Sequence, residues 1–120
     1  MLYFYPKDDT PGCTTEACQF RDDIPRFREL GVTLLGVSAD GVESHEAFAR
    51  KYHLPFPLLS DPNGEVARAY GSLFSLGPLS FARRHSFIID RDGRIAKIYR
   101  DVNPKTHSDQ MIEDLRALGV

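Results

Sequence analysis

Two cysteines, Cys13 and Cys18, lie five residues apart near the start of a chain of 120 residues. A cysteine thiolate is a nucleophile and a metal ligand, and a second thiol within reach can convert an oxidised cysteine into a disulfide. Both belong to the stretch YPKDDTPGCTTEAC, residues 5–18, and the chain has no other cysteine. The pair therefore predicts either a redox centre or a metal site.

The neighbouring residues predict that Cys13 stands where a strand passes into a helix. The apolar run over residues 2–5 indicates a buried strand that Pro6 ends, and residues 10–12 (TPG) indicate a turn. Cys13 then falls in or just before the first turn of a helix. Unpaired N–H groups and the positive end of the helix dipole favour thiolate over thiol there. On position alone, a buried and unreactive core cysteine remains the alternative.

Spacing argues against a metal site. The cysteines form C-x-x-x-x-C rather than C-x-x-C, no second pair exists, and the four histidines are scattered over the chain at His45, His53, His85 and His107. We expect no metal and no cofactor. Two cysteines are too few for a disulfide scaffold, which suits a reducing compartment, where a close pair is more often redox-active than structural.

Length and charge limit the class of protein further. A chain of 120 residues predicts one domain, 1–120, with a core of its own. A net charge of −2 and a pI near 6.0 argue against nucleic acid or an anionic membrane as partner. Apolar runs are too short to cross a bilayer, and residues 1–5 lack the features of a signal peptide. We expect a soluble cytoplasmic protein.

The order of elements predicts an α/β fold. We expect strands at 2–5, 32–37, 58–59, 86–89 and 94–100, and helices at 14–30 (interrupted by Pro25), 43–53, 65–70 and 107–118. Expected inward residues are Ala47, Phe48 and Tyr52, then Met111, Ile112, Leu115 and Leu118. Residues 71–83 are expected to form a loop. A central mixed sheet flanked by helices follows, and the final hairpin and helix are typical of a thioredoxin-like fold.

Helical geometry separates the two cysteines. At about 100° per residue, Cys13 shares the core-facing stripe with Ala17, Phe20 and Ile24, while Cys18 is turned roughly 140° away, toward solvent. Their Cα atoms would lie about 8–9 Å apart in an intact helix. A disulfide needs less than about 7 Å, so the pair can bond only where the helix unwinds locally.

Several motifs resemble one known family. Pro6, Thr10 and Cys13 spell P-x-x-x-T-x-x-C, which resembles the active-site motif of the peroxiredoxins. The wider string FYPKDDTPGCTTEAC resembles the subgroup called bacterioferritin comigratory protein, or peroxiredoxin Q. The segments GVTLLGVSAD, FPLLSD and RRHSFIIDRDGRI resemble that subgroup in order and spacing, and residues 71–83 match least.

The resemblance implies a role for each matching residue. Cys13 would be the peroxidatic cysteine and Cys18 the resolving one. The hydroxyl of Thr10 would hydrogen-bond the thiolate and the bound peroxide, and Pro6 would pack over the site and limit access of water.

The family also carries an arginine two residues before the Ser or Thr of a late strand, here Arg84 before Ser86. A guanidinium stabilises both a thiolate and a developing oxyanion. Arg83 is adjacent, but strand alternation points the two side chains in opposite directions. We expect Arg84 to be the active-site arginine.

The implied activity is that of an atypical 2-Cys, thioredoxin-dependent peroxidase. It would reduce hydrogen peroxide and organic hydroperoxides, form an intramolecular disulfide, and be recycled by thioredoxin or a similar dithiol. We expect a monomer, with a dimer as the alternative. The competing interpretation is a redox-sensing or partner-binding module without efficient turnover, which would not need Thr10 or Arg84.

Other residues are expected to have structural roles. Lys7, Asp8 and Asp9 indicate a solvated loop, and His85 and His107 are expected in loop or surface settings rather than as a catalytic base. The family resembled has an N-terminal hairpin before the strand at 2–5, and here that hairpin is expected to be absent. An uncovered apolar surface would follow, with lower stability, self-association or weaker catalysis.

Overall fold

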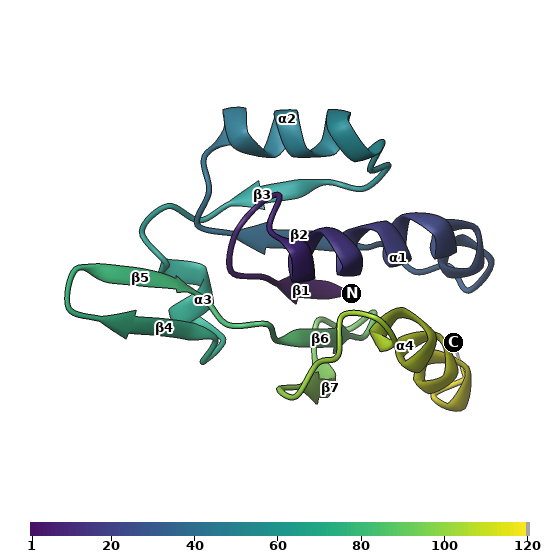
Figure 1. The fold of residues 1–120 in the computed structure, drawn as a ribbon. Helices are drawn as coiled ribbons and strands as arrows, with labels where there is room; N and C mark the ends of the chain where they lie inside the picture. The colour runs from purple at the N-terminus through teal and green to yellow at the C-terminus, as the bar shows by residue number, and fades with distance from the viewer. Residues whose placement is uncertain (120) are drawn as a thin grey trace.

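The computed structural model describes residues 1–119, so Val120, the end of the expected domain, lies outside the described residues. The elements follow one another in Figure 1. They are β1 (Leu2–Phe4), α1 (Pro11–Glu29), β2 (Leu35–Ser38), α2 (Val42–Tyr52), β3 (Leu58–Ser60), α3 (Glu65–Ala69), β4 (Leu73–Leu76), β5 (Leu79–Ala82), β6 (Ser86–Ile89), β7 (Ile95–Tyr99) and α4 (His107–Ala117).

A five-stranded sheet in the order β3-β2-β1-β6-β7 forms the centre of the fold. β1 is its middle strand, parallel to β2 and antiparallel to β6. All three residues of β1 are buried, because the sheet is covered on both faces. The predicted mixed sheet flanked by helices, of thioredoxin-like type, is confirmed. Because β1 is the central strand, its carboxyl end and the loop that leads to α1 lie at the middle of one end of the sheet.

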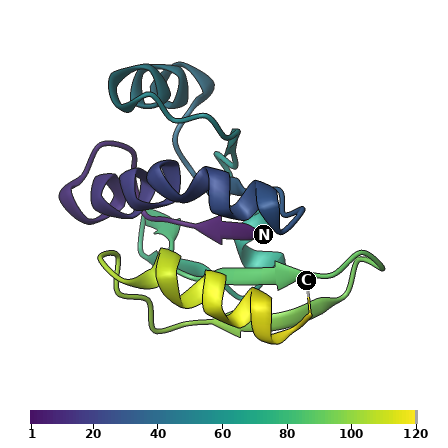
Figure 2. The same cartoon turned by 90° about the vertical axis from the view of Figure 1, so that its right-hand side faces the viewer.

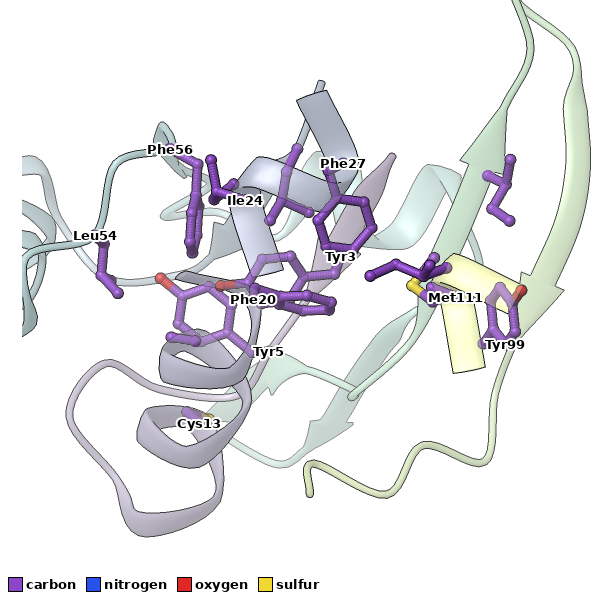
Figure 3. Close-up of a cluster of buried hydrophobic side chains, with 14 of the residues drawn as sticks. Tyr3, Tyr5, Cys13, Phe20, Ile24, Phe27, Leu54, Phe56, Tyr99 and Met111 are labelled. Atoms are coloured by element: carbon purple, nitrogen blue, oxygen red, sulfur yellow. The ribbon is translucent and has the colours of Figure 1, made fainter. Parts of the chain in front are cut away.

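The helices divide between the two faces. Figure 2 shows α1 and α4 on the same face of the sheet, turned toward the viewer. Tyr3 and Tyr5 point to this side and pack with apolar residues of both helices, in the cluster drawn in Figure 3. Leu2 and Phe4 point to the opposite side, where α3 and β5 contribute Ala67 and Ala82. Cys13 belongs to the first cluster, so the reactive sulfur lies at the edge of the main core.

α1 differs from its predicted form. It begins at Pro11 instead of residue 14 and continues without a break through Pro25. Proline at the first helical position is favoured because its missing N–H would have no partner there. Pro25 removes only the hydrogen bond to the carbonyl of Arg21, while Ile24 and Phe27 on either side of it are buried and hold the helix against the sheet. Packing outweighs the proline, so the predicted interruption is wrong.

Residues 71–83 also differ from their predicted form, because they contain the two-stranded sheet β4–β5 rather than a loop. Its turn is Gly77-Pro78, with Gly77 at a φ of 57°, a conformation that glycine adopts without steric cost. Figure 1 shows the hairpin projecting from the sheet. Two residues predicted to face inward are exposed: Ala47 on α2 and Leu118, which follows α4.

One hollow of about 540 Å³ lies on the α3 face of the sheet. Its lining is mainly apolar and includes Leu35, Val37, Leu59, Val66 and Tyr70. Leu59 and Val66 are each 44% exposed, so this face carries accessible apolar surface. Among residues 1–119, no helix has the length and apolar character needed to cross a membrane.

Candidate active site

Cys13 is the third residue of α1 and is only 2% exposed. The first hydrogen bond of the helix runs from the N–H of Thr14 to the carbonyl of Thr10, at 2.8 Å. The N–H groups of Gly12 and Cys13 therefore lie ahead of the helical ladder, at the positive end of the helix dipole. The sulfur is thus sheltered from bulk water and stands in a field that favours negative charge.

The guanidinium of Arg84 lies directly against this sulfur. Its Nη2 donates to the Sγ of Cys13 at 3.3 Å, and its Nη1 donates to Oε1 of Glu16 at 3.0 Å. A Cβ atom on Gly12 would stand only 3.0 Å from Nη2, so the absence of a side chain lets the cation reach the helix start. Arg83 points elsewhere, with its guanidinium 5.2 Å from the centre of the Phe74 ring. The two side chains diverge as predicted, although both residues lie between β5 and β6 rather than within a strand.

Glu16 is a site residue that the sequence reasoning missed. It is 1% exposed, and its Oε2 has no hydrogen-bond partner among the described residues. Burial raises the pKa of Glu16 to about 7, against the opposing attraction of Arg84. An acidic residue three positions after Cys13 lies on the same helix face, and that spacing was the available signal.

Thr10 is the N-cap residue of α1, and Pro6 lies in the loop between β1 and α1. The hydroxyl of Thr10 donates its proton to the carbonyl of Lys7 at 2.9 Å, so it is not donated to the thiolate as expected. Its oxygen keeps lone pairs that can accept a hydrogen bond. Pro6 is half-buried and lines a hollow of about 410 Å³ that reaches the β4–β5 hairpin at Leu79 and Phe81.

Cys18 lies five residues along the same helix and is partly exposed, whereas Cys13 is buried. Both thiols are free, and α1 is continuous from Pro11 to Glu29. The arrangement agrees with the predicted division into an inward and an outward cysteine. A direct bond between them requires local unwinding of α1.

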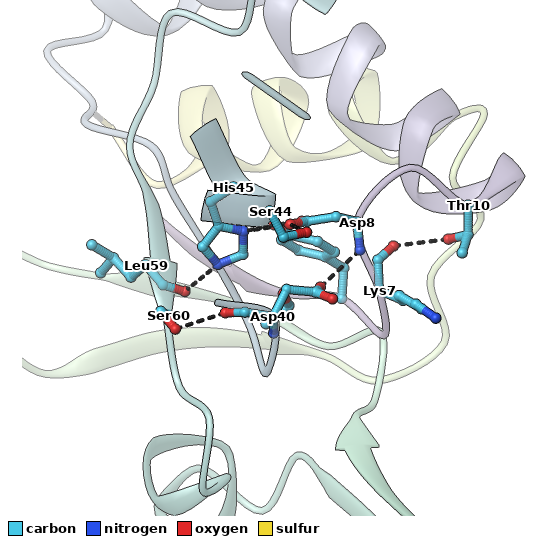
Figure 4. A network of polar contacts seen from close by, with 10 residues as sticks. Lys7, Asp8, Thr10, Asp40, Ser44, His45, Leu59 and Ser60 are labelled. Atoms are coloured by element: carbon cyan, nitrogen blue, oxygen red, sulfur yellow. Dashed lines mark hydrogen bonds and ion pairs between the residues drawn. The ribbon is translucent and has the colours of Figure 1, made fainter. Parts of the chain in front are cut away.

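The solvated-loop prediction for residues 7–9 holds for Lys7 and Asp9 but is wrong for Asp8, which is 7% exposed. The carboxylate of Asp8 accepts hydrogen bonds from Tyr5, Ser44 and His45, as Figure 4 shows in part. Burying a charged group costs free energy unless it is paired and hydrogen-bonded, and these partners supply both.

His85 and His107 are buried as well, contrary to the prediction of surface or loop settings. His85 pairs with the hydroxyl of Ser72 at 2.8 Å, and His107 pairs with that of Ser86 at 2.8 Å. Burial lowers the pKa of both rings, which favours their neutral forms. Both of these serines are fully buried.

Among residues 1–119, one group of side chains is placed closely enough to hold a metal ion, because Asp8, Asp40 and His45 offer ligand atoms within 4.8 Å of one another. Nδ1 of His45 lies 2.7 Å from Oδ2 of Asp8, which is the distance of a charge-assisted hydrogen bond. Hydroxyl and backbone N–H donors also occupy the carboxylate oxygens of Asp8 and Asp40. This arrangement is an ion pair within a hydrogen-bond network rather than a coordination sphere.

The fold and the site together define a class: a thioredoxin-like protein with a cysteine thiol at a helix start, held beside an arginine. The chain belongs to the AhpC/TSA family, whose sequence profile matches residues 1–98. Its relatives include proteins of the peroxiredoxin Q and Bcp group, as the resemblance predicted.

Three comparisons illustrate the relationship. The chain is 40% identical to the chloroplastic peroxiredoxin Q of Sedum lineare over 122 residues, covering 98% of this chain and 63% of that protein. It is 43% identical to peroxiredoxin Bcp of Bacillus subtilis over 125 residues, covering 99% and 78%. The structure of the bacterioferritin comigratory protein of Xanthomonas campestris superimposes with a TM-score of 0.92 at 34% identity, covering 99% and 78%.

The share covered differs between these groups. The chain spans 54% to 63% of the length of the plant peroxiredoxin Q proteins it matches from Sedum lineare, Gentiana triflora and Populus jackii.

Proposed function

We propose that this protein is a thiol peroxidase in which Cys13 reduces hydrogen peroxide and organic hydroperoxides. The observation that carries the proposal is the 3.3 Å contact between Nη2 of Arg84 and the buried Sγ of Cys13 at the start of α1. A fixed guanidinium at this point stabilises the attacking thiolate and also the negative charge that develops on the peroxide oxygen.

The first step oxidises Cys13. Its thiolate attacks one peroxide oxygen, the S–O bond forms as the O–O bond breaks, and sulfur becomes a sulfenic acid. The second oxygen leaves as hydroxide or alkoxide and takes a proton from solvent, giving water or an alcohol. Sulfur loses the two electrons that the peroxide gains.

The second step joins Cys13 and Cys18. The Cys18 sulfur attacks the sulfenic acid, the S–S bond forms, and the S–O bond breaks with release of water. α1 must unwind locally for this step, because the helix holds the two Cα atoms about 8–9 Å apart. Thioredoxin or a similar dithiol then restores both thiols by exchange and is itself oxidised.

In this proposal, Thr10 and Pro6 serve the bound peroxide. The Thr10 proton is engaged by the Lys7 carbonyl, so the hydroxyl oxygen accepts a hydrogen bond from the peroxide O–H. Pro6 limits water at the site, which strengthens the electrostatic contribution of Arg84.

Substrate and reductant are assigned by relationship. The bacterioferritin comigratory protein of Xanthomonas campestris has alkyl peroxide reduction activity, and we extend this substrate class to the present chain. The cycle consumes an external dithiol, which a reducing compartment supplies, so we assign it to the cytoplasm. We further propose that residues 1–120 act as one domain and as a monomer.

Single-turnover quenched-flow kinetics, with thiol alkylation and intact-mass detection, test the function. We expect Cys13→Ser to leave peroxide unreacted, and Cys18→Ser to react once, stop at the sulfenic acid and then over-oxidise. Wild-type protein should turn over with thioredoxin. A Cys18→Ser protein that turns over normally would contradict the resolving role. Wild-type protein that is oxidised once without turnover would instead support a redox sensor.

The two arginines provide a matched pair of variants. Arg84→Ala should slow Cys13 oxidation by about 100-fold or more, the cost of losing a fixed charge-stabilising donor. Arg83→Ala should change it by less than about twofold, because that side chain stacks on Phe74 instead. Equal rates for wild type and Arg84→Ala would contradict the proposed function.

A further inference from the structure

We propose that a buried polar network centred on His45 positions the hydroxyl of Thr10 for peroxide binding. The inference rests on the proposed peroxidase function and assigns positioning residues to it. The network acts through one peptide group, the one joining Lys7 to Asp8.

This peptide group is held at both ends. Its carbonyl, on Lys7, accepts the Thr10 hydroxyl proton at 2.9 Å, and its N–H, on Asp8, donates to Oδ2 of Asp40 at 2.8 Å. Figure 4 shows both contacts on opposite sides of the loop. A peptide unit is planar and rigid, so rotating it away from Asp40 also moves the carbonyl away from Thr10. Asp40 therefore controls where the Thr10 proton points.

Asp40 is itself fixed in place. Its Oδ2 also accepts the hydroxyl proton of Ser38 at 2.6 Å, and its backbone carbonyl accepts that of Ser60 at 2.6 Å. Both serines lie on strands of the central sheet, Ser38 at the end of β2 and Ser60 at the end of β3. Asp40 is thus attached to two strands of the central sheet.

The side chain of Asp8 provides the second attachment of the same loop. Its carboxylate accepts the Tyr5 hydroxyl at 2.6 Å, the Ser44 hydroxyl at 2.8 Å and Nδ1 of His45 at 2.7 Å. Two of these partners lie on α2. Asp8 therefore ties the loop before Thr10 to a helix that carries neither cysteine.

The geometry requires a particular protonation state of His45. Nδ1 faces the Asp8 carboxylate, and Nε2 lies 3.0 Å from the carbonyl of Leu59, which can only accept. Both ring nitrogens must donate, so the ring is a cation that forms a buried ion pair with Asp8. Burial alone would lower the pKa of His45, but the hydrogen bond and attraction of Asp8, aided by the Leu59 carbonyl and the charge of Asp40, raise it.

The network should affect the reaction of Cys13 with peroxide but not its reaction with an alkylating agent. The helix start and Arg84 set the nucleophilicity of Cys13, and neither belongs to the network. The network sets only whether Thr10 accepts from the peroxide or turns its proton elsewhere. Weakening it should slow oxidation by peroxide while leaving the reaction of Cys13 with an alkylating agent nearly unchanged.

The test compares two reactions of the same sulfur in the full chain. At pH 6, His45→Gln should slow Cys13 oxidation by hydrogen peroxide about tenfold, a modest misplacement effect, and change iodoacetamide alkylation less than about twofold. Asp8→Asn, which keeps shape and removes the charge, should do the same. His53→Asn is the matched control, since His53 is the exposed residue that directly follows α2, and it should change neither rate.

The pH profile supplies a readout that a general loss of structure would not produce. As pH rises through the pKa of His45, the wild-type advantage over His45→Gln should shrink, because the wild-type ring then loses its charge too. A constant ratio of the two rates across pH, or an equal loss of oxidation and alkylation, would overturn the proposal.

An NMR titration of the wild-type protein tests whether His45 acts on Thr10, even if a variant fails to fold. We expect both His45 ring nitrogens to be protonated at pH 6, and the Thr10 resonances to shift with the same midpoint as the ring. If the Thr10 resonances do not shift as His45 titrates, the proposed positioning role of His45 is wrong. Failure of wild-type protein to react with peroxide would overturn the proposed function alone, because the titration measures the network without peroxide.

Discussion

The guanidinium of Arg84 divides its two amino groups between the sulfur of Cys13 and the carboxyl of Glu16. This fork fixes the plane of the cation, because each terminal nitrogen has its own acceptor. The position of Glu16 costs desolvation free energy, since the side chain is buried and one of its oxygens has no hydrogen-bond partner among the described residues. The buried Glu16 carboxyl therefore lowers the stability of the fold while it orients the charge of Arg84.

Glu16→Gln tests that trade. In the unfolded chain Glu16 loses its proton near its ordinary pKa of 4.5, whereas in the folded protein burial raises this pKa to about 7. Between these values the folded state binds more protons, so stability falls as pH rises through this window. We expect the variant to be more stable than wild type at pH 8 by up to about 3 kcal/mol, with no difference below pH 4.5. Denaturant unfolding at both pH values measures this.

The same variant should oxidise more slowly, because Arg84 loses its charged anchor. Glu46→Gln, an exposed glutamate on α2, serves as control and should alter neither property. A Glu16→Gln protein that is both less stable at pH 8 and fully active would contradict this account of the pair.

Some residues of the candidate site could be predicted from the sequence and others could not, for a physical reason. The inward and outward placement of Cys13 and Cys18 follows from helix position, a local property, whereas Arg84 was expected from the resemblance of its segment to a known family. Asp8 looked solvated because its neighbours are polar, and its partner His45 stands 37 positions away. Only the folded chain brings that cation to it.

Among the elements, α1 carries both cysteines, and in the proposed cycle it must shelter Cys13 and also unwind far enough for Cys18 to reach it. Pro25 lies in its second half and deprives the Arg21 carbonyl of its helical partner. The packing of Ile24 and Phe27 that keeps the helix continuous depends on tertiary contacts, which the sequence pattern around a proline does not show.

Pro25→Ala should restore that hydrogen bond and stabilise the fold by roughly 1–3 kcal/mol, the scale of a proline penalty in a helix. A firmer α1 should also slow disulfide formation after oxidation by a few-fold, while the oxidation step is unchanged. Rapid-quench trapping of both steps measures this. Arg28→Ala, at an exposed site on the same helix, is the control, and faster disulfide formation in Pro25→Ala would contradict the expectation.

The hairpin β4–β5 shows a different limit of prediction. Its strands, Leu73–Leu76 and Leu79–Ala82, mix apolar and small residues without a regular alternation, because much of the hairpin is exposed on both sides. A period of two arises when one face of a strand is buried and the other is not. Here burial did not impose that pattern, and the segment resembled a loop.

On the scale of the whole molecule, the hollow around Leu59 and Val66 on the α3 side of the sheet carries accessible apolar surface. We expect the native protein to bind an apolar fluorescent dye such as ANS at neutral pH.

Val66→Glu should reduce the native-state dye fluorescence by at least about half, because a charge is placed at the rim of the hollow. Val42→Glu gives the matched control, since Val42 is 64% exposed on α2, away from the hollow. Equal dye binding by all three proteins would show that this face is closed in solution.

Arg84 contacts Cys13 and Glu16 and lies beside Gly12, and all three residues are in the opening turns of α1. In the proposed cycle those turns unwind to join the cysteines, and the cation would then lose its sulfur partner and its helical neighbours in the same event. The Arg84 side chain, 21% exposed in the reduced protein, would become more accessible in the disulfide form. We expect a molecule with an anionic group to distinguish the two states by that charge, without contacting either cysteine.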